Sequence, residues 1–206
     1  IPNFNMPNIN EFKFHHNQLF GGIPNFNNPK DLKWLWVDNN KLTELIQDFT
    51  GALPALSLFY ANNNNYTFSD LINSTLANKA HIDAPPPKSL NPADSFIYAP
   101  QQKIYSDTTI TISPCTDYTL DLEIDDTVTS STYAWSKNGS PFMTIKGSNK
   151  LIFKNFTSAD NGTYTVLITN PLAPQLTLES HPIRLSSSGA LANINNPRDT
   201  TLSCGL

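Results

Sequence analysis

Three asparagines at nearly equal spacing constrain the fold of the first third of the chain more than any other feature. Asn17, Asn40 and Asn64 lie 23 and 24 residues apart, and hydrophobic residues recur at the same positions around each of them. These positions are Ile9, Phe12, Phe14 and Leu19 in the first copy, Leu32, Leu35, Val37 and Leu42 in the second, and Leu56, Phe59, Ala61 and Tyr66 in the third. Repetition at this period predicts stacked units that share one core, each contributing a short parallel strand.

The pattern L-x-x-L-x-L-x-x-N-x-L that these positions spell is typical of leucine-rich repeats. In such a solenoid the recurring asparagine turns inward and bonds backbone groups left unpaired where the chain leaves the strand. The segment 17–24 also resembles the N-x-L-x-G-x-I-P sequence of plant-type and many bacterial leucine-rich repeats. We therefore assign a structural role to Asn17, Asn40 and Asn64.

Three repeats alone would leave hydrophobic surface exposed at the first repeat. We therefore interpret residues 1–83 as the end of a longer array with a C-terminal cap. The cap is expected to be a short helix that includes Leu71 and Leu76, with Ser69 or Asp70 at its N-terminal cap. Residues 84–100 follow as a stiff linker, because their prolines fix φ and remove backbone donors.

The second unit, residues 101–186, contains short alternating segments separated by turn residues. The predicted strands are 109–113, 118–124, 132–137, 150–155, 163–169 and 176–185. About seven short strands in about 90 residues is the arrangement typical of a β-sandwich. The predicted fold is therefore mainly β: a leucine-rich repeat solenoid of parallel strands followed by an immunoglobulin-like antiparallel β-sandwich.

Two motifs underlie the immunoglobulin-like assignment. Trp135 lies in a predicted strand that an Asn-Gly turn follows, as the core tryptophan of such domains does. Asp160, Gly162 and Tyr164 resemble the D-x-G-x-Y tyrosine corner. The second cysteine of antibody domains is replaced here by Val166, so we expect aliphatic packing in place of the inter-sheet disulfide.

The two cysteines of the chain, Cys115 and Cys204, flank this unit, and the sequence leaves their pairing open. Taken together, the repeats, the segment 98–101 and the sandwich closing on residues 181–183 resemble large surface or secreted proteins of Bacteroidetes bacteria. The resemblance covers about residues 1–186 and implies export and further domains on a longer parent chain. Residues 187–206 are a tail or the start of another module.

Composition and charge exclude several functions. Charged residues make up 15% of the chain and the formal net charge is −4, so a nucleic-acid partner is not expected. No apolar run is long enough to insert into a membrane. No cofactor and no catalytic motif are expected, and His15 and His16 lack a third metal ligand. An acidic cluster favours a solvated strand edge over the alternative of a calcium site. It comprises Asp117, Asp121, Glu123, Asp125 and Asp126.

The functional prediction rests on residues that alternate with the core positions of the repeats and therefore project from the concave face. The candidate ligand-binding residues are Trp34, Trp36, Tyr60, Lys13, Glu11, His15 and Asp38. Aromatic rings in register on an exposed sheet suit protein or glycan recognition. The competing interpretation is that the tryptophans pack against neighbouring side chains.

We therefore expect a non-catalytic extracellular or cell-surface module for binding or adhesion, with a protein or glycan ligand. Two alternatives stay open: an accessory segment of a large secreted hydrolase, and a structural spacer or filament subunit. The domains of the parent chain would distinguish the first alternative, and elongated self-association would indicate the second.

Overall fold

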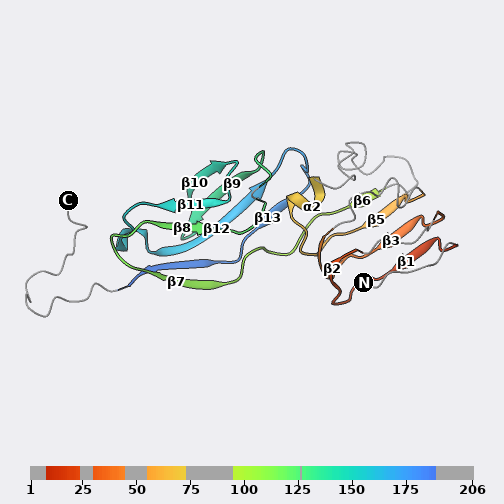
Figure 1. Cartoon of the computed structure of the whole chain (residues 1–206), viewed down its shortest axis with the longest axis horizontal. Coiled ribbons are helices and arrows are strands. Elements are labelled where there is room, and N and C mark those ends of the chain that lie inside the picture. The colour runs from red at the N-terminus through yellow and green to blue at the C-terminus, as the bar shows by residue number, and fades with distance from the viewer. Residues whose placement is uncertain (1–7, 24–29, 45–54, 73–94, 126, 189–206) are drawn as a thin grey trace, which may run out of the picture.

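The computed structural model of the protein describes residues 8–23, 30–44, 55–72, 95–125 and 127–188. These residues are mainly β. Short parallel strands make up the N-terminal part, and a mixed sheet makes up most of the C-terminal part (Figure 1).

A four-stranded parallel sheet contains the repeat strands. Its order is β1 (Glu11–Lys13), β3 (Trp34–Trp36), β5 (Leu58–Tyr60) and β6 (Ser95–Ile97). The register aligns equivalent positions of the repeats: Glu11 with Trp34 and Leu58, and Lys13 with Trp36 and Tyr60. The parallel arrangement expected for the first three strands is confirmed. A second parallel pair, β2 (Phe20–Gly22) with β4 (Lys41–Glu44), was not predicted.

A ladder of side-chain amides connects successive turns of the N-terminal part. Asn40 Nδ2 donates to the carbonyl oxygens of Phe14 at 2.8 Å and Val37 at 2.9 Å, one in the preceding turn and one in its own. Asn64 repeats this pattern, donating to Val37 at 3.0 Å and Ala61 at 3.1 Å. The residue before each asparagine of the ladder has a left-handed backbone: φ is 56° at His16, 55° at Asn39 and 55° at Asn63. This conformation favours asparagine over most other residues.

Gln101 forms a fourth rung that the sequence pattern did not predict. Its Nε2 donates to Ala61 O at 3.0 Å and Tyr98 O at 2.6 Å, and its Oε1 accepts from Asn64 N at 2.9 Å. The strand β6, which precedes it, lies within the range interpreted as linker, and it pairs in parallel with β5. The parallel sheet therefore continues through the last residues of the proline-containing segment.

The C-terminal part has a six-stranded and a two-stranded sheet. Its strands are β7 (Thr108–Ile112), β8 (Tyr118–Asp121), β9 (Thr132–Lys137), β10 (Ser140–Lys146), β11 (Lys150–Phe153), β12 (Gly162–Thr169), β13 (Thr177–Glu179) and β14 (Ile183–Ser187). The larger sheet has the order β10-β9-β12-β14-β7, with β13 also on β12, and the smaller one pairs β11 with β8. The expected purely antiparallel sandwich is wrong in one pair, because β7 lies parallel to β14. The strand β10 was not predicted, and the last predicted strand is divided into β13 and β14.

The two sheets share a core that Trp135 and Tyr164 fill, both buried. The rings of Phe153 on β11 and Tyr164 on β12 meet edge to face with centroids 5.5 Å apart. Val166 is buried, as expected for aliphatic packing in place of the inter-sheet disulfide, and Leu122 is buried as well. Cys115 is disulfide-bonded, and Cys204 lies outside the described residues.

The corner between the 3-10 helix η2 (Ser158–Asp160) and β12 is closed by Tyr164. Its hydroxyl donates to Asp160 O at 2.6 Å. Burial, and then the Asp160 charge, raise the pKa of Tyr164 to about 12. Gly162 is closely approached by side chains, because a Cβ there would lie 2.9 Å from Lys137 Cε and 3.0 Å from Asn138 Oδ1, so a larger residue would require these side chains to shift.

The two parts of the chain meet where Asp125 caps the short helix α2 (Phe68–Ile72). Asp125 is buried, and its carboxylate accepts from the backbone N–H of Phe68 at 3.1 Å and of Ser69 at 2.7 Å. A carboxylate at the N-terminus of a helix satisfies donors that have no partner within the helix. The loop after β8 in the C-terminal part therefore stabilises a helix of the N-terminal part.

The N-cap of α2 is Thr67, so the expected cap at Ser69 or Asp70 is wrong. The Asp70 carboxylate instead accepts from the backbone of this cap residue, with Thr67 N at 2.7 Å, and from Thr67 Oγ1 at 3.0 Å, which is one half of a capping box. Its carboxyl group is half-buried and lies near Asp125 and Glu44. The pKa of Asp70 is raised from its usual 3.8 to about 6, chiefly because the carboxyl group is buried and also because these two negative charges lie near it.

This raised pKa predicts a pH dependence of stability. Because the folded protein holds the Asp70 proton more tightly than the unfolded chain does, the free energy of unfolding should fall as pH rises from about 4 to about 6. Each pK unit corresponds to about 1.4 kcal/mol, and partial exposure of the carboxyl reduces the expected change to about 1 kcal/mol in total. Urea unfolding of the wild type and of Asp70→Asn across this pH range measures it. The same slope in the variant would contradict the assignment to Asp70.

Only a few residues connect the two parts after the fourth rung. Gln102 N donates to Asn64 O at 2.8 Å and its Nε2 to Asn40 O at 2.8 Å, so Gln102 is held by the parallel sheet. Two residues later, Ile104 N donates to Glu179 O at 2.9 Å and Ile104 O accepts from His181 N at 2.9 Å. The connection is therefore hydrogen-bonded to the N-terminal part at one end and to the C-terminal part at the other.

Candidate binding face of the parallel sheet

The sheet β1-β3-β5-β6 presents an aromatic surface on the face opposite its core. Side chains alternate along each short strand, so Phe12, Leu35 and Phe59 are buried while their neighbours project from the other face. Trp34 and Trp36 flank Leu35, and their ring centroids lie 6.4 Å apart. Trp34 is 36% exposed, which is high for so large an apolar side chain.

The middle row of this face is a stack of Lys13, Trp36 and Tyr60 across three strands. The rings of Trp36 and Tyr60 are 8° from parallel with centroids 6.2 Å apart, and Lys13 Nζ lies 5.0 Å from the Trp36 ring centroid. Because β1 and β5 lie on either side of β3, Lys13 and Tyr60 flank opposite sides of the indole. Neighbouring side chains therefore engage both faces of Trp36, as the competing interpretation expected, and a ligand would meet its edge.

Charge on the middle row is partly neutralised. Lys13 Nζ lies 2.8 Å from Glu11 Oε1, and both side chains are partly exposed. Exposed ion pairs of this kind contribute about 0–1 kcal/mol, so the pair stabilises the fold little. Its effect is to hold the ammonium group over the indole.

The next row along the strands contains His15, Asp38 and Asn62. The backbone pairing continues here, because His16 N donates to Asp38 O at 3.1 Å and Asn39 N to Asn62 O at 3.0 Å. Each of the three side chains has one buried polar atom without a hydrogen-bond partner among the described residues: His15 Nδ1, Asp38 Oδ1 and Asn62 Oδ1. Polar atoms buried in this state are uncommon in folded proteins.

The structure brings all seven predicted binding residues together on one face, although their binding role stays a prediction. The repeat pattern also places Asn62 at the position of His15 and Asp38, although Asn62 is not among the predicted binding residues. Sequence reasoning missed Ile97. Ile97 aligns with Tyr60 through β6, and the proline-containing segment before it obscured that strand.

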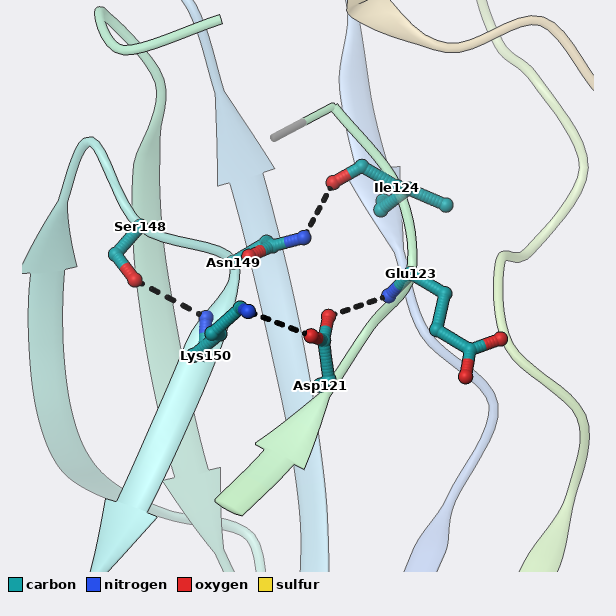
Figure 2. Close-up of polar contacts among 6 residues, drawn as sticks. All are labelled: Asp121, Glu123, Ile124, Ser148, Asn149 and Lys150. Carbon is teal, nitrogen blue, oxygen red and sulfur yellow. Dashed lines mark hydrogen bonds and ion pairs between the residues drawn. The ribbon is translucent and has the colours of Figure 1, made fainter. Parts of the chain in front are cut away.

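The acidic cluster does not form a candidate metal site within the described part of the chain. No three ligating side chains lie close enough together there to hold an ion. Asp121 accepts from Glu123 N at 2.9 Å and lies 3.0 Å from Lys150 Nζ, while the Glu123 side chain extends away from it (Figure 2). These contacts, the backbone one first, lower the pKa of Asp121. Asp125 is used in capping α2, and Asp126 lies outside the described residues.

No helix among the described residues is long and apolar enough to cross a membrane. Neither protein-family models nor curated proteins give a match to this chain.

Solved structures show a distant similarity to immunoglobulin-like domains. Extracellular domains 3–5 of Drosophila OTK match at 16% identity and a TM-score of 0.32. The match covers 38% of this chain and 32% of that one, so it spans about a third of the solved OTK fragment. The immunoglobulin-like domain of mouse leukocyte-associated immunoglobulin-like receptor 1, a strand-swapped dimer, matches at 17% identity with a TM-score of 0.31. That match covers 43% of this chain and 97% of the receptor domain. The D1 domain of Duf (Kirre) matches at 13% identity with a TM-score of 0.31, over 40% of this chain and 89% of that domain.

Proposed function

We propose that the chain is a non-catalytic binding or adhesion module at the cell surface or outside the cell, with a protein or glycan ligand on the β1-β3-β5-β6 face. In this proposal the N-terminal part is the end of a leucine-rich repeat solenoid and the C-terminal part an immunoglobulin-like sandwich. The short connection from Gln102 to Ile104 then marks the boundary between the two domains. Further domains belong to a longer parent chain.

The observation that carries the proposal is the aromatic surface in register with charged and amide groups. Trp34 and the edges of Trp36 and Tyr60 offer apolar area on rigid rings, and rings of this kind are enriched at binding hot spots. Aromatic side chains have only two rotatable χ angles, so little conformational entropy is lost when they bind a ligand. The ladder of Asn40, Asn64 and Gln101 holds the strands in register beneath them.

The proposal predicts that Trp34→Ala/Trp36→Ala abolishes or strongly weakens binding. A panel of glycans and of surface proteins is first screened with the wild-type chain, and the affinity of each positive ligand is then measured for the double variant. We expect at least a tenfold loss, about 1.4 kcal/mol or more, because the variant removes the exposed apolar area. Far-UV circular dichroism checks that the β-structure is retained.

Phe20→Ala is the matched control. Phe20 is a 79% exposed aromatic residue of the same part of the chain, but it lies on β2, outside the candidate face. Its loss should leave the affinity unchanged. Unchanged binding by the double tryptophan variant would exclude this face from the function.

A further inference from the structure

Four asparagines among the described residues lie in the sequence Asn-x-Ser/Thr, where x is not proline. They are Asn65, Asn138, Asn155 and Asn161, and a fifth, Asn73, lies outside the described residues. This tripeptide is the acceptor of asparagine-linked glycans in exported proteins. A glycan is bulky and hydrated, so the asparagine that carries it must be exposed in the folded protein and must have an amide that the fold does not use. These two criteria separate the four asparagines.

Three of the four fail a criterion. Asn65 and Asn161 are half-buried, and Asn161 Oδ1 accepts from Ser187 N at 2.6 Å. Asn138 is exposed, but its Oδ1 accepts from a backbone N–H of β12 at 2.9 Å. A Cβ on Gly162 would lie 3.2 Å from Asn138 Nδ2, so this amide is packed against β12. A sugar on that nitrogen would collide with the strand.

Asn155 meets both criteria. It is exposed in the bend after β11, and its side-chain amide makes no hydrogen bond within the described residues. Other groups hold the bend in place. Asn155 N donates to Asp117 Oδ1 at 3.1 Å, Phe156 N donates to Thr116 O at 2.8 Å, and the Phe156 side chain is buried. The fold therefore uses the backbone of Asn155 and leaves its amide available for a substituent.

A glycan on Asn155 would not cover the aromatic face. The loop that contacts the Asn155 bend precedes β8, whereas Asp125, which contacts α2, follows β8. The loop before β8 lies at the end of the sandwich remote from the parallel strands (Figure 1). Modification at this end is therefore compatible with binding at the other.

We propose that Asn155, in preference to the other three asparagines, carries an asparagine-linked oligosaccharide when the chain is exported. In the transfer, Asn155 Nδ2 forms a bond to the anomeric carbon of the oligosaccharide, and the bond from that carbon to the diphosphate of a lipid donor breaks. The diphosphate leaves with the bonding electron pair, and one amide proton goes to a base of the transferase. The inference rests on export, which is part of the proposed function, and needs no ligand on the aromatic face.

The third residue of the tripeptide indicates when the transfer takes place. In the folded chain the Thr157 hydroxyl donates to Asp160 Oδ2 at 3.0 Å and accepts from Ala159 N at 3.2 Å. It is therefore engaged in capping η2 and is not free for recognition by the transferase. The transfer must precede folding of this corner.

The test maps the glycans on the whole chain, secreted by cultured eukaryotic cells behind a cleavable signal peptide. Peptide-N-glycosidase F in heavy-oxygen water converts each glycosylated asparagine to an aspartate that carries the heavy isotope. Mass spectrometry of the peptides then gives the occupied fraction at each position. We expect the fraction at Asn155 to be about tenfold or more above that at Asn65, Asn138 or Asn161, because the folded protein accommodates a glycan only at an exposed and unused amide.

Three substitutions accompany the map. Asn155→Gly should abolish the glycan of this bend without disturbing it, because glycine accommodates the left-handed φ of 50°. Thr157→Ser should retain the glycan, since serine completes the same tripeptide and also caps a helix. Asn161→Asp is the matched control. It removes another acceptor tripeptide but keeps the oxygen that accepts from Ser187 N, so the glycosylated mass should change little.

An unmodified Asn155 in the secreted wild-type chain, or equal occupancy of all four asparagines, would overturn the inference. Either result would leave the proposed function standing if a screened ligand still depends on Trp34 and Trp36. Binding that is indifferent to both tryptophans would instead remove the proposed function, but not a glycan found at Asn155.

Discussion

Replacing Asn64 with alanine is expected to lower the free energy of unfolding by about 4 kcal/mol, a loss that would unfold a marginally stable domain. The side chain is fully buried. Its Oδ1 accepts from Leu42 N at 3.0 Å, and its Nδ2 donates to Val37 O at 3.0 Å and Ala61 O at 3.1 Å. Alanine would leave Leu42 N without a partner, at a cost of about 1–3 kcal/mol for a buried unpaired group. Val37 O and Ala61 O would keep their bonds from Asn40 and Gln101 but lose the second one, about 0.5–1.5 kcal/mol each. Urea unfolding followed by tryptophan fluorescence measures the change.

Asn17→Ala is the matched control, because Asn17 occupies the same repeat position at the first rung. It is exposed, and among the described residues its Nδ2 donates to the carbonyl oxygens of Phe14 at 3.1 Å and His15 at 3.0 Å, both within its own turn. We expect a loss below about 1 kcal/mol. Equal losses for Asn17→Ala and Asn64→Ala would show that the ladder does not stabilise the stacked turns in the way described.

Replacing Asp125 with alanine is expected to lower the stability of the chain by about 3 kcal/mol and to separate the unfolding of its two parts. The carboxylate is buried and satisfies Phe68 N and Ser69 N, so its loss leaves two donors unpaired at the N-terminus of α2. Hydrogen bonds to charged groups contribute about 1.5–3 kcal/mol each. Unfolding should become biphasic, with Trp34 and Trp36 reporting the N-terminal part and Trp135 the C-terminal part.

Asp121→Ala controls for the loss of a carboxylate from the end of β8. The contacts of Asp121 among the described residues lie within its own part of the chain, with Glu123 N and the exposed Lys150. An effect below about 1 kcal/mol is expected, with a single unfolding transition. A single transition in Asp125→Ala as well would mean that the contact with α2 does not couple the two parts.

The repeat strands could be predicted because their core positions recur around Asn40 and Asn64 at fixed intervals. The fourth strand could not, because Gln101 replaces asparagine and lies 37 residues after Asn64. With its longer side chain, Gln101 donates to Ala61 O of the preceding turn and to Tyr98 O of its own turn, as each asparagine does in its repeat. The hydrogen bonds are therefore preserved although the sequence spacing is not. The prolines before Gln101 favoured a linker, because proline fixes φ and has no backbone donor. The pairing of β6 with β5 in the folded chain overrides this local preference.

In the C-terminal part, too, some features could be predicted from the sequence and others could not. Tyr164 and Gly162 could be assigned because the D-x-G-x-Y motif places them at fixed spacing from Asp160, whose carbonyl oxygen accepts from the Tyr164 hydroxyl. The strand β10 was missed since nearly all of its side chains are exposed and show no alternation of buried and exposed positions. Its pairing with β9 is set by backbone hydrogen bonds and the preceding Asn-Gly turn. The role of Asp125 depends on a contact with a helix 56 residues away, which no local pattern encodes.

The short connection from Gln102 to Ile104 has a mechanical consequence. Its first residue is hydrogen-bonded through the backbone to the N-terminal part, and its last residue to the C-terminal part. Asp125 adds a second contact between the two parts, because its carboxylate accepts from the N-terminus of α2. A force or torque applied to the sandwich is therefore transmitted directly to the aromatic face. The orientation of a ligand bound on that face follows the orientation of the sandwich.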